Sequence, residues 1–219
     1  MPRQTNFIDE VFGQIEFIID DTQGIMNQFG LTSATVLNLC GGIPLATITS
    51  IRVHISSQYA GALTVHVITD QYEVIRSIDF DLRRIDNRSM VVDKEERGNG
   101  IGTNLFLNQI QTARQLQFIK LQTFTRAPST HDDEDQDWQG YYFWANLGFL
   151  NIETEEFTQW CVARTLGEIT LNELMQTEDG RALWKQQGYA WIGEFILENG
   201  HTCSAYLNLY LQRKEIDWP

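Results

Sequence analysis

The sequence predicts an α/β protein in which helices cover a mixed sheet. Residues 72–82 alternate apolar and polar side chains, as a strand with one buried face does. Residues 102–116 repeat apolar side chains at helical spacing, directly after a β-branched stretch and a glycine-rich turn. The chain has 219 residues, of which 42% are hydrophobic, so it is long enough to bury one core. These observations together predict a mixed α/β domain.

The elements of the first half follow from the spacing of apolar residues. Residues 6–28 predict a helix, because Phe7, Val11, Ile15 and Ile18 fall on one face. Runs rich in β-branched residues predict strands. We expect strands at residues 43–55, 63–69, 72–82, 87–93 and 118–125, with a hairpin turn at Asp70–Gln71.

The second half predicts short helices and one or two strands. Residues 170–176 and 177–187 are each opened by a threonine that can cap a helix. A strand at 189–197 and a final strand or helix at 204–213 follow. We expect a core over residues 1–150 and a C-terminal extension of the same domain over residues 151–219.

Charge and cysteine content restrict the class of protein. The formal net charge of −13 argues against nucleic acid or an anionic membrane as a partner. Residues 83–128 carry four more basic than acidic side chains, so the remaining chain is strongly acidic and favours a cationic acceptor. The three cysteines and four histidines have no metal-ligand spacing, which predicts reduced thiols and no metal site. No secretory or membrane-spanning run occurs, and we expect a cytoplasmic protein.

Residues 97–102 are the most informative segment of the chain. They read Arg-Gly-Asn-Gly-Ile-Gly and lie between the expected strand at 87–93 and the expected helix at 102–116. Closely spaced glycines let the backbone approach a ligand, and a helix N-terminus favours an anion. An ordinary glycine-rich turn is the alternative. The glycine spacing differs from the Gly-x-Gly-x-x-Gly dinucleotide fingerprint. The segment also lacks the lysine of a nucleoside triphosphate-binding loop.

The segment resembles the Arg/Gln-x-x-Gly-x-Gly/Ala signature of the GNAT acyltransferase superfamily, with Arg97, Gly100 and Gly102 in the defining positions. A second stretch agrees, since residues 141–149 look like the helix ending in Leu-Gly-Phe that closes the conserved part of that superfamily. The resemblance implies a GNAT-like acyl-CoA N-acyltransferase fold whose co-substrate is acetyl-CoA or another acyl-CoA. The implied coenzyme A contacts are Met90, Val92, Arg97, Gly98, Asn99, Gly100, Ile101, Gly102, Thr103 and Trp144.

The resemblance leaves the proton donor open. Many members of the superfamily carry a tyrosine four residues before the glycine of the Gly-Phe pair, where this chain has Trp144. An indole N–H is not a usable general acid near neutral pH. Tyr141, one helical turn earlier, and its neighbour Tyr142 are the candidates for the acid. The alternative is that both tyrosines pack in the core and that water protonates the thiolate.

The acceptor amine must lose a proton, and the sequence offers several candidate bases. They are Asp79, Asp81, His131 and the acidic run 132–137. That run is also explained as a solvated loop, or as an electrostatic funnel for a cationic acceptor.

The expected function is transfer of an acyl group, most simply acetyl, to an amine-bearing small molecule or peptide within a ternary complex. One alternative is a transferase of a longer fatty acyl chain to a peptide or protein side chain. The other is an acyl-CoA-binding module without turnover. The sequence allows a homodimer. Aromatic residues of the extension, such as Trp160, Trp184 and Trp191, either line an acceptor site or pack in the core.

Overall fold

The computed structural model describes residues 15–43, 50–126 and 140–218. Contacts divide the chain into two compact units, residues 1–118 and residues 119–219. The expected core over residues 1–150 and its extension over residues 151–219 stay a prediction.

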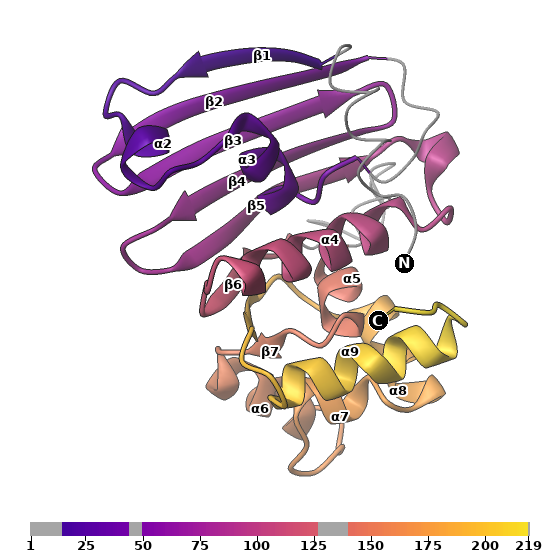
Figure 1. The fold of residues 1–219 in the computed structure, drawn as a ribbon. Helices are drawn as coiled ribbons and strands as arrows, with labels where there is room; N and C mark the ends of the chain where they lie inside the picture. Colours follow the sequence, from indigo (N-terminus) through magenta and orange to yellow (C-terminus); the bar gives the residue numbers. More distant parts are fainter. Residues whose placement is uncertain (1–14, 44–49, 127–139, 219) are drawn as a thin grey trace. The chain divides into compact units, whose positions relative to one another are not determined.

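The first unit contains a five-stranded sheet and is drawn in indigo to magenta in Figure 1. Its strands are ordered β1-β2-β3-β4-β5. Strand β1 is parallel to β2, and the other neighbours are antiparallel, so the sheet is mixed. The elements are β1 Ile15–Asp20, α2 Ile25–Gln28, α3 Ser33–Leu39, β2 Ile51–Tyr59, β3 Ala62–Thr69, β4 Tyr72–Asp79, β5 Arg84–Val92, the 3-10 turn η1 Lys94–Glu96 and α4 Ile101–Gln115.

One face of this sheet forms the core of the first unit. Side chains two residues apart point to the same face of a strand, which places a set of apolar residues under the helices. Helix α3 packs on α4 and β3, and α4 also packs on β5. In Figure 1, α3 lies over the strands on this face. The fully buried apolar side chains here include Val53, Val65, Val67, Val74 and Ile78.

The expected helix over residues 6–28 is wrong for residues 15–20, which form β1. Ile15 and Phe17 are half-buried and Glu16 is exposed, which is the two-residue period of a strand. Pairing of the whole strand with β2 satisfies its backbone groups. Residues 25–28 are helical as expected, and residues 6–14 lie outside the described residues.

The second unit combines a small antiparallel sheet with five helices among its described residues, in orange to yellow in Figure 1. Strand β8 pairs with β6 on one side and β7 on the other. The elements are β6 Lys120–Phe124, α5 Gly140–Asn146, β7 Leu150–Asn151, α6 Thr154–Val162, α7 Leu171–Leu174, α8 Glu178–Gln187, β8 Ile192–Ile196 and α9 Thr202–Arg213.

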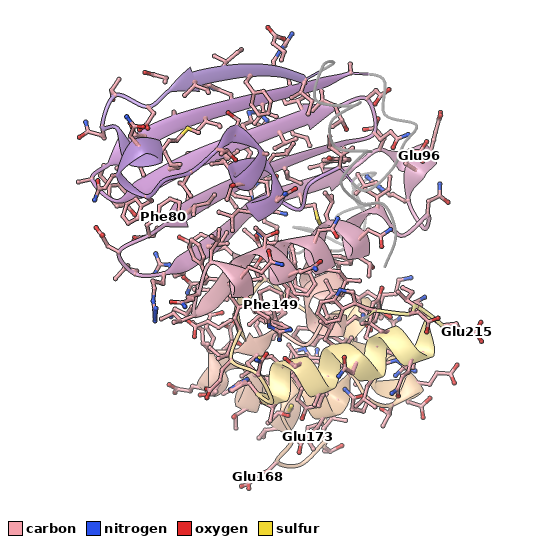
Figure 2. The ribbon with its side chains drawn as sticks, viewed as in Figure 1. Phe80, Glu96, Phe149, Glu168, Glu173 and Glu215 are labelled. Atoms are coloured by element: carbon pink, nitrogen blue, oxygen red, sulfur yellow. The ribbon has the colours of Figure 1, made fainter. Side chains whose placement is uncertain are left out.

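Two helices of this unit, α7 and α8, begin where the sequence predicts threonine caps. The Thr170 hydroxyl accepts from the Glu173 backbone N–H, and the Glu173 carboxylate accepts from the Thr170 N–H, which completes a capping box. Glu173 is labelled in Figure 2. Thr177 caps α8 in the same way through the Gly180 N–H. The last element, left open as strand or helix, is the helix α9.

The mixed α/β class is confirmed by these elements. Among the described residues, no helix is long and apolar enough to cross a bilayer.

Candidate functional site: the glycine loop and its supports

Strand β5 carries a bulge shortly before the glycine-rich segment. Ile75 pairs with Ser89, whereas the next residue of β4 pairs with Asn87. Arg88 is therefore an additional residue on β5. A β-bulge bends the strand and interrupts the ladder of hydrogen bonds. The strand then resumes through the half-buried Met90 and ends at Val92.

The glycine loop, residues 97–100, connects β5 and η1 to α4. Gly98 has φ 88° and Gly100 has φ 80°, both in the left-handed region that glycine adopts without steric cost. A Cβ at Gly98 would meet nothing within 4 Å, so the space above the loop is open there. In Figure 2, the labelled Glu96 marks η1 immediately before this loop. The loop therefore presents backbone on an accessible side of the first unit.

Helix α4 begins at this loop with a terminus suited to an anion. Its first hydrogen bond runs from the Asn104 N–H to the Gly100 carbonyl at 2.9 Å. The N–H groups of Ile101 and Gly102 consequently have no intrahelical acceptor. The first turn contains no acidic side chain that would compete with a bound anion. The helix has 15 residues, long enough to present a full terminal dipole.

Arg97 connects the loop to the end of β5. Its Nε donates to the Val92 carbonyl at 3.0 Å, while the side chain remains exposed. Within the loop, Asn99 Nδ2 donates to the Glu96 carboxylate at 3.2 Å. The first hydrogen bond holds the Arg97 guanidinium at the end of β5, and the second ties the loop to η1.

Helix α4 is held in place by close backbone contact with the end of α3. At Gly41, φ is 111°, and a Cβ would lie 2.6 Å from the Leu105 carbonyl oxygen. No other residue type fits there without moving one of the backbones. Asn108 Nδ2 donates to the Gly41 carbonyl at 3.1 Å, which fixes the same contact from the helix side.

Three buried polar residues connect β4, β5 and α4, and the sequence reasoning missed all of them. Arg76 is 1% exposed, Asn87 2% and Gln109 0%. The available signal was Arg76, which takes an inward position between Val74 and Ile78 in the alternating strand. A charge at such a position is uncommon, because burial of an ionised group is costly.

Candidate bases on the first unit lie far from the glycine loop. Asp79 pairs with Arg84 at one end of the β4–β5 hairpin, and Tyr72 pairs with Val92 at the other. Seven residues at about 3.3 Å each separate the two ends by roughly 23 Å. Asp81 is exposed in the turn beyond Asp79, so it is not brought to the end of β5 that carries the loop.

Asp79 also has a structural role. Its carboxylate accepts from the Tyr59 hydroxyl at 3.1 Å and from the Leu82 backbone N–H at 2.8 Å. These contacts close the β4–β5 turn and use the oxygens that a general base would need. His131 and the acidic run 132–137 lie outside the described residues.

The three aromatic candidates of the second unit lie on α5. Tyr141 is 5% exposed and its hydroxyl donates to the Lys185 carbonyl of α8. Burial, and then the neighbouring Tyr142, raise the pKa of Tyr141. Tyr142 is half-buried, and the Lys185 ammonium lies 5.8 Å from the centre of its ring. The Tyr141 hydroxyl thus has a backbone acceptor inside the second unit.

Trp144 packs between aromatic rings of its own segment. It is 6% exposed, and its ring centre lies 5.1 Å from those of both Phe143 and Phe149. Gly148, which ends the helix with φ 89°, allows this segment to turn back. A Cβ at Gly148 would lie 2.7 Å from the Cys203 carbonyl oxygen, so the Leu-Gly-Phe glycine is required by packing.

Three tryptophans of the C-terminal extension, Trp160, Trp184 and Trp191, are buried, which agrees with the packing interpretation. Trp184 is fully buried and contacts the ring of Trp160 at 5.1 Å between centres. The indole N–H groups of Trp184 and Trp191 both donate to the Tyr141 carbonyl, at 3.3 and 3.0 Å. These contacts tie α5 to α8 and to the residue that precedes β8.

The described residues contain no group of three or more histidine, cysteine or acidic side chains that could hold a metal ion. The cysteines Cys40, Cys161 and Cys203 are all buried and unpaired with each other.

Comparisons with known proteins give a match at the level of solved structures only. No protein-family model matches the chain, and no curated protein does. The chain is similar to an acetyltransferase of the GNAT family from Staphylococcus aureus Mu50, with 13% identity, a TM-score of 0.37 and coverage of 90% of this chain and 98% of that chain.

Two other matched structures are also described as acetyltransferases. Nourseothricin acetyltransferase has 17% identity and a TM-score of 0.35 over 64% of this chain and 67% of that chain. The ribosomal-protein-S18-alanine N-acetyltransferase from Escherichia coli has 13% identity and a TM-score of 0.31 over 66% and 74%. At these identities and TM-scores, the matched structures do not identify the residues of the site.

Proposed function

We propose that the protein transfers an acyl group from a coenzyme A thioester to an amine. One observation carries this proposal: the glycine loop joins a bulged strand to a helix whose first turn has no acid, with Arg97 beside it. This combination suits a pyrophosphate, because backbone N–H groups, a helix dipole and a guanidinium all favour a multiply charged anion. Acetyl-CoA is the simplest donor that carries such a group.

In the proposed reaction, the amine nitrogen attacks the thioester carbonyl carbon and the carbon–sulfur bond then breaks. The end of β5, with Met90 and Val92, is the proposed seat of the pantetheine arm. A backbone N–H of this strand directed at the carbonyl would stabilise the oxyanion, an effect of about 3 kcal/mol when one such donor is well placed. The amine proton passes to a base or to water, and the thiolate takes a proton in turn.

The contacts of Tyr141 bear on the source of that last proton. A buried hydroxyl that donates to a backbone carbonyl must break this bond before it can protonate a thiolate. We therefore propose water as the proton source and a packing role for Tyr141. The acceptor is proposed to be a small amine or a peptide amine, in keeping with the acidic balance of the chain outside residues 83–128.

A second candidate function is an acyl-CoA-binding module without turnover. It is favoured by the same observation on Tyr141, together with Trp144 at the position of the usual acid. Both functions require coenzyme A binding at the glycine loop, and they differ only in thiol release.

The test is calorimetry with acetyl-CoA, followed by a thiol-release assay. Acyl-CoAs of several lengths are each combined with amines, polyamines and lysine peptides. Binding with amine-dependent thiol release supports the transferase, and a preference for long chains would identify a fatty acyl donor. Binding without release by any amine supports the module. Absence of binding for every acyl-CoA refutes both.

A further inference from the structure

The bulge of β5 is supported from inside the core by a group of three residues, Arg76, Asn87 and Gln109, here called the bulge cluster. They come from β4, β5 and α4, and each is at most 2% exposed. All three belong to the first unit. Fully buried polar side chains are uncommon, and those that occur are normally hydrogen-bonded.

Arg76 donates to a backbone carbonyl next to the bulge. Its Nη1 donates to the Ser89 carbonyl across the strand pair at 2.7 Å and to the Ile75 carbonyl at 3.2 Å. Ser89 directly follows the additional residue of the bulge and directly precedes Met90. The guanidinium therefore holds the backbone at the point where β5 resumes toward the glycine loop.

Gln109 extends the same support to the helix. Its Nε2 donates to the Asn87 side-chain oxygen and to the Leu39 carbonyl, both at 3.0 Å. Asn87 lies on the other side of the bulge from Ser89. Gln109 lies two turns along α4 from the loop, so its hydrogen bonds fix α4 against β5 and against the end of α3.

Packing alone does not explain why residue 76 is an arginine, because its side chain is charged. No carboxylate of the described residues forms an ion pair with it, and its Nε has no hydrogen-bond partner there. Burial lowers the pKa of Arg76 to about 10, with the nearby Cys40 and Tyr72 acting in the opposite direction. Burial of an ionised group has a desolvation cost that an apolar side chain of similar size would not have. A guanidinium kept at this cost offers what an apolar side chain lacks, namely N–H donors for two backbone carbonyls.

We propose that Arg76, with Asn87 and Gln109, is a positioning residue for the acyl donor. The bulge cluster sets the path of β5 after the bulge relative to α4. It thereby fixes the spacing between the backbone at residues 90–92, which is the proposed seat of the thioester, and the glycine loop, which is the proposed seat of the pyrophosphate. This inference rests on the proposed function, because it concerns the same donor site.

The test compares Arg76→Met with a matched control, Val65→Ala. Val65 pairs with Arg76 across β3 and β4 and is fully buried on the same face, but it donates no side-chain hydrogen bond. Both changes alter the buried face of the sheet, so thermal unfolding measures how far each one changes the stability. Gln109→Leu removes the link between α4 and β5 without a change of charge.

The first readout is amide hydrogen exchange of residues 89–92 in the protein without ligand. We expect exchange there to become about tenfold faster in Arg76→Met and Gln109→Leu, because the local hydrogen-bonded unit opens more often. In Val65→Ala, exchange of these amides should increase, relative to the wild-type protein, no more than exchange of the other amides of the sheet. This readout does not depend on the proposed function.

The second readout uses acetyl-CoA labelled with ¹³C at the thioester carbonyl. Infrared difference spectra report the hydrogen bond to that carbonyl, and thiol release reports turnover. We expect Arg76→Met to weaken the carbonyl shift and to lower turnover by about 10²-fold, the typical cost of a misplacement of about 1 Å. The affinity for coenzyme A itself should change little, since the glycine loop is unaltered.

The outcomes separate the two proposals. Unchanged exchange and an unchanged carbonyl band in a folded Arg76→Met or Gln109→Leu protein overturn the positioning role. If neither variant folds while Val65→Ala does, the bulge cluster is a determinant of folding, and the positioning role is again overturned. If the wild-type protein binds no acyl-CoA, the proposed function fails, and hydrogen exchange alone decides whether the cluster holds the bulge.

Discussion

Substitution of Gly100 by aspartate tests the anion site at the glycine loop most directly. Gly100 has φ 80°, and a Cβ there would meet only Asn104 Nδ2, at the ordinary contact distance of 3.8 Å. A side chain therefore fits, and the remaining cost is that of the left-handed backbone. Aspartate and asparagine tolerate this region better than other residues. Both Gly100→Asp and Gly100→Asn are expected to fold.

The aspartate and asparagine side chains have almost the same shape and differ by one charge, so Gly100→Asn is the matched control for Gly100→Asp. A carboxylate about 5 Å from one pyrophosphate charge is repelled by about 3 kcal/mol at an effective dielectric constant of 20, and by about 0.8 kcal/mol in bulk water. Between these limits, the dissociation constant for coenzyme A should be about 4- to 200-fold higher for aspartate than for asparagine. Added salt should reduce the difference, because the loop is exposed.

Calorimetric titration of both variants with coenzyme A at low and high salt measures this ratio. Circular dichroism and thermal unfolding confirm that both proteins are folded. Equal affinities of Gly100→Asp and Gly100→Asn at low salt would refute the placement of the pyrophosphate at residues 97–103.

Three further predictions concern the remaining residues. Tyr141→Phe should lower the free energy of unfolding by about 1–3 kcal/mol, because it leaves the Lys185 carbonyl without its donor. Turnover should remain unchanged across the pH range, whereas a loss of about 10²-fold or more in kcat would identify Tyr141 as a general acid. Gly148→Ala should destabilise the protein by about 3 kcal/mol or more, since its Cβ would lie 2.7 Å from a backbone carbonyl of α9 in addition to the strain of φ 89°. Gly200→Ala, with φ 80° but open space, isolates the strain, so similar unfolding temperatures for the two glycine variants would contradict the steric account. Burial raises the pKa of Cys40 from 9.0 to about 12, so the unfolded thiol ionises first and stability should fall by roughly 1.4 kcal/mol per pH unit as pH rises from about 9 to about 12. Cys40→Val should flatten that slope in pH-dependent denaturation, and an unchanged slope would show that the Cys40 thiol does not cause it.

The expected helix at the N-terminus shows where sequence periodicity fails. Ile15 and Ile18 continue a three-to-four-residue spacing, yet Ile15 and Phe17 also satisfy a two-residue spacing. A short apolar run satisfies both periods, and only a partner decides between them. Here the partner is β2, and parallel pairing with a strand more than thirty residues away leaves no local signal.

The same limit applied to the last element. Residues 204–213 carry apolar side chains compatible with strand or helix, and the structure forms a helix that begins at Thr202. The His201 side chain accepts from the Cys203 N–H at its N-terminus. Histidine is an unusual cap, so no recognisable start signal preceded the helix.

Local chemistry alone determined the glycine loop, the helix after it, the hairpin at Asp70–Gln71 and the threonine caps. Each depends on the φ preference of a residue or on a hydrogen bond within a few positions, which the sequence states directly. The bulge cluster and the distance of Asp81 from the loop were decided only by the tertiary structure. Arg76 and Gln109 are 33 positions apart in the sequence, and their common environment exists only once β4, β5 and α4 are packed together. The alternation of residues 72–82 marks Arg76 as inward-facing, but the partners that a buried polar group needs come from distant parts of the chain and are set only by the folded core.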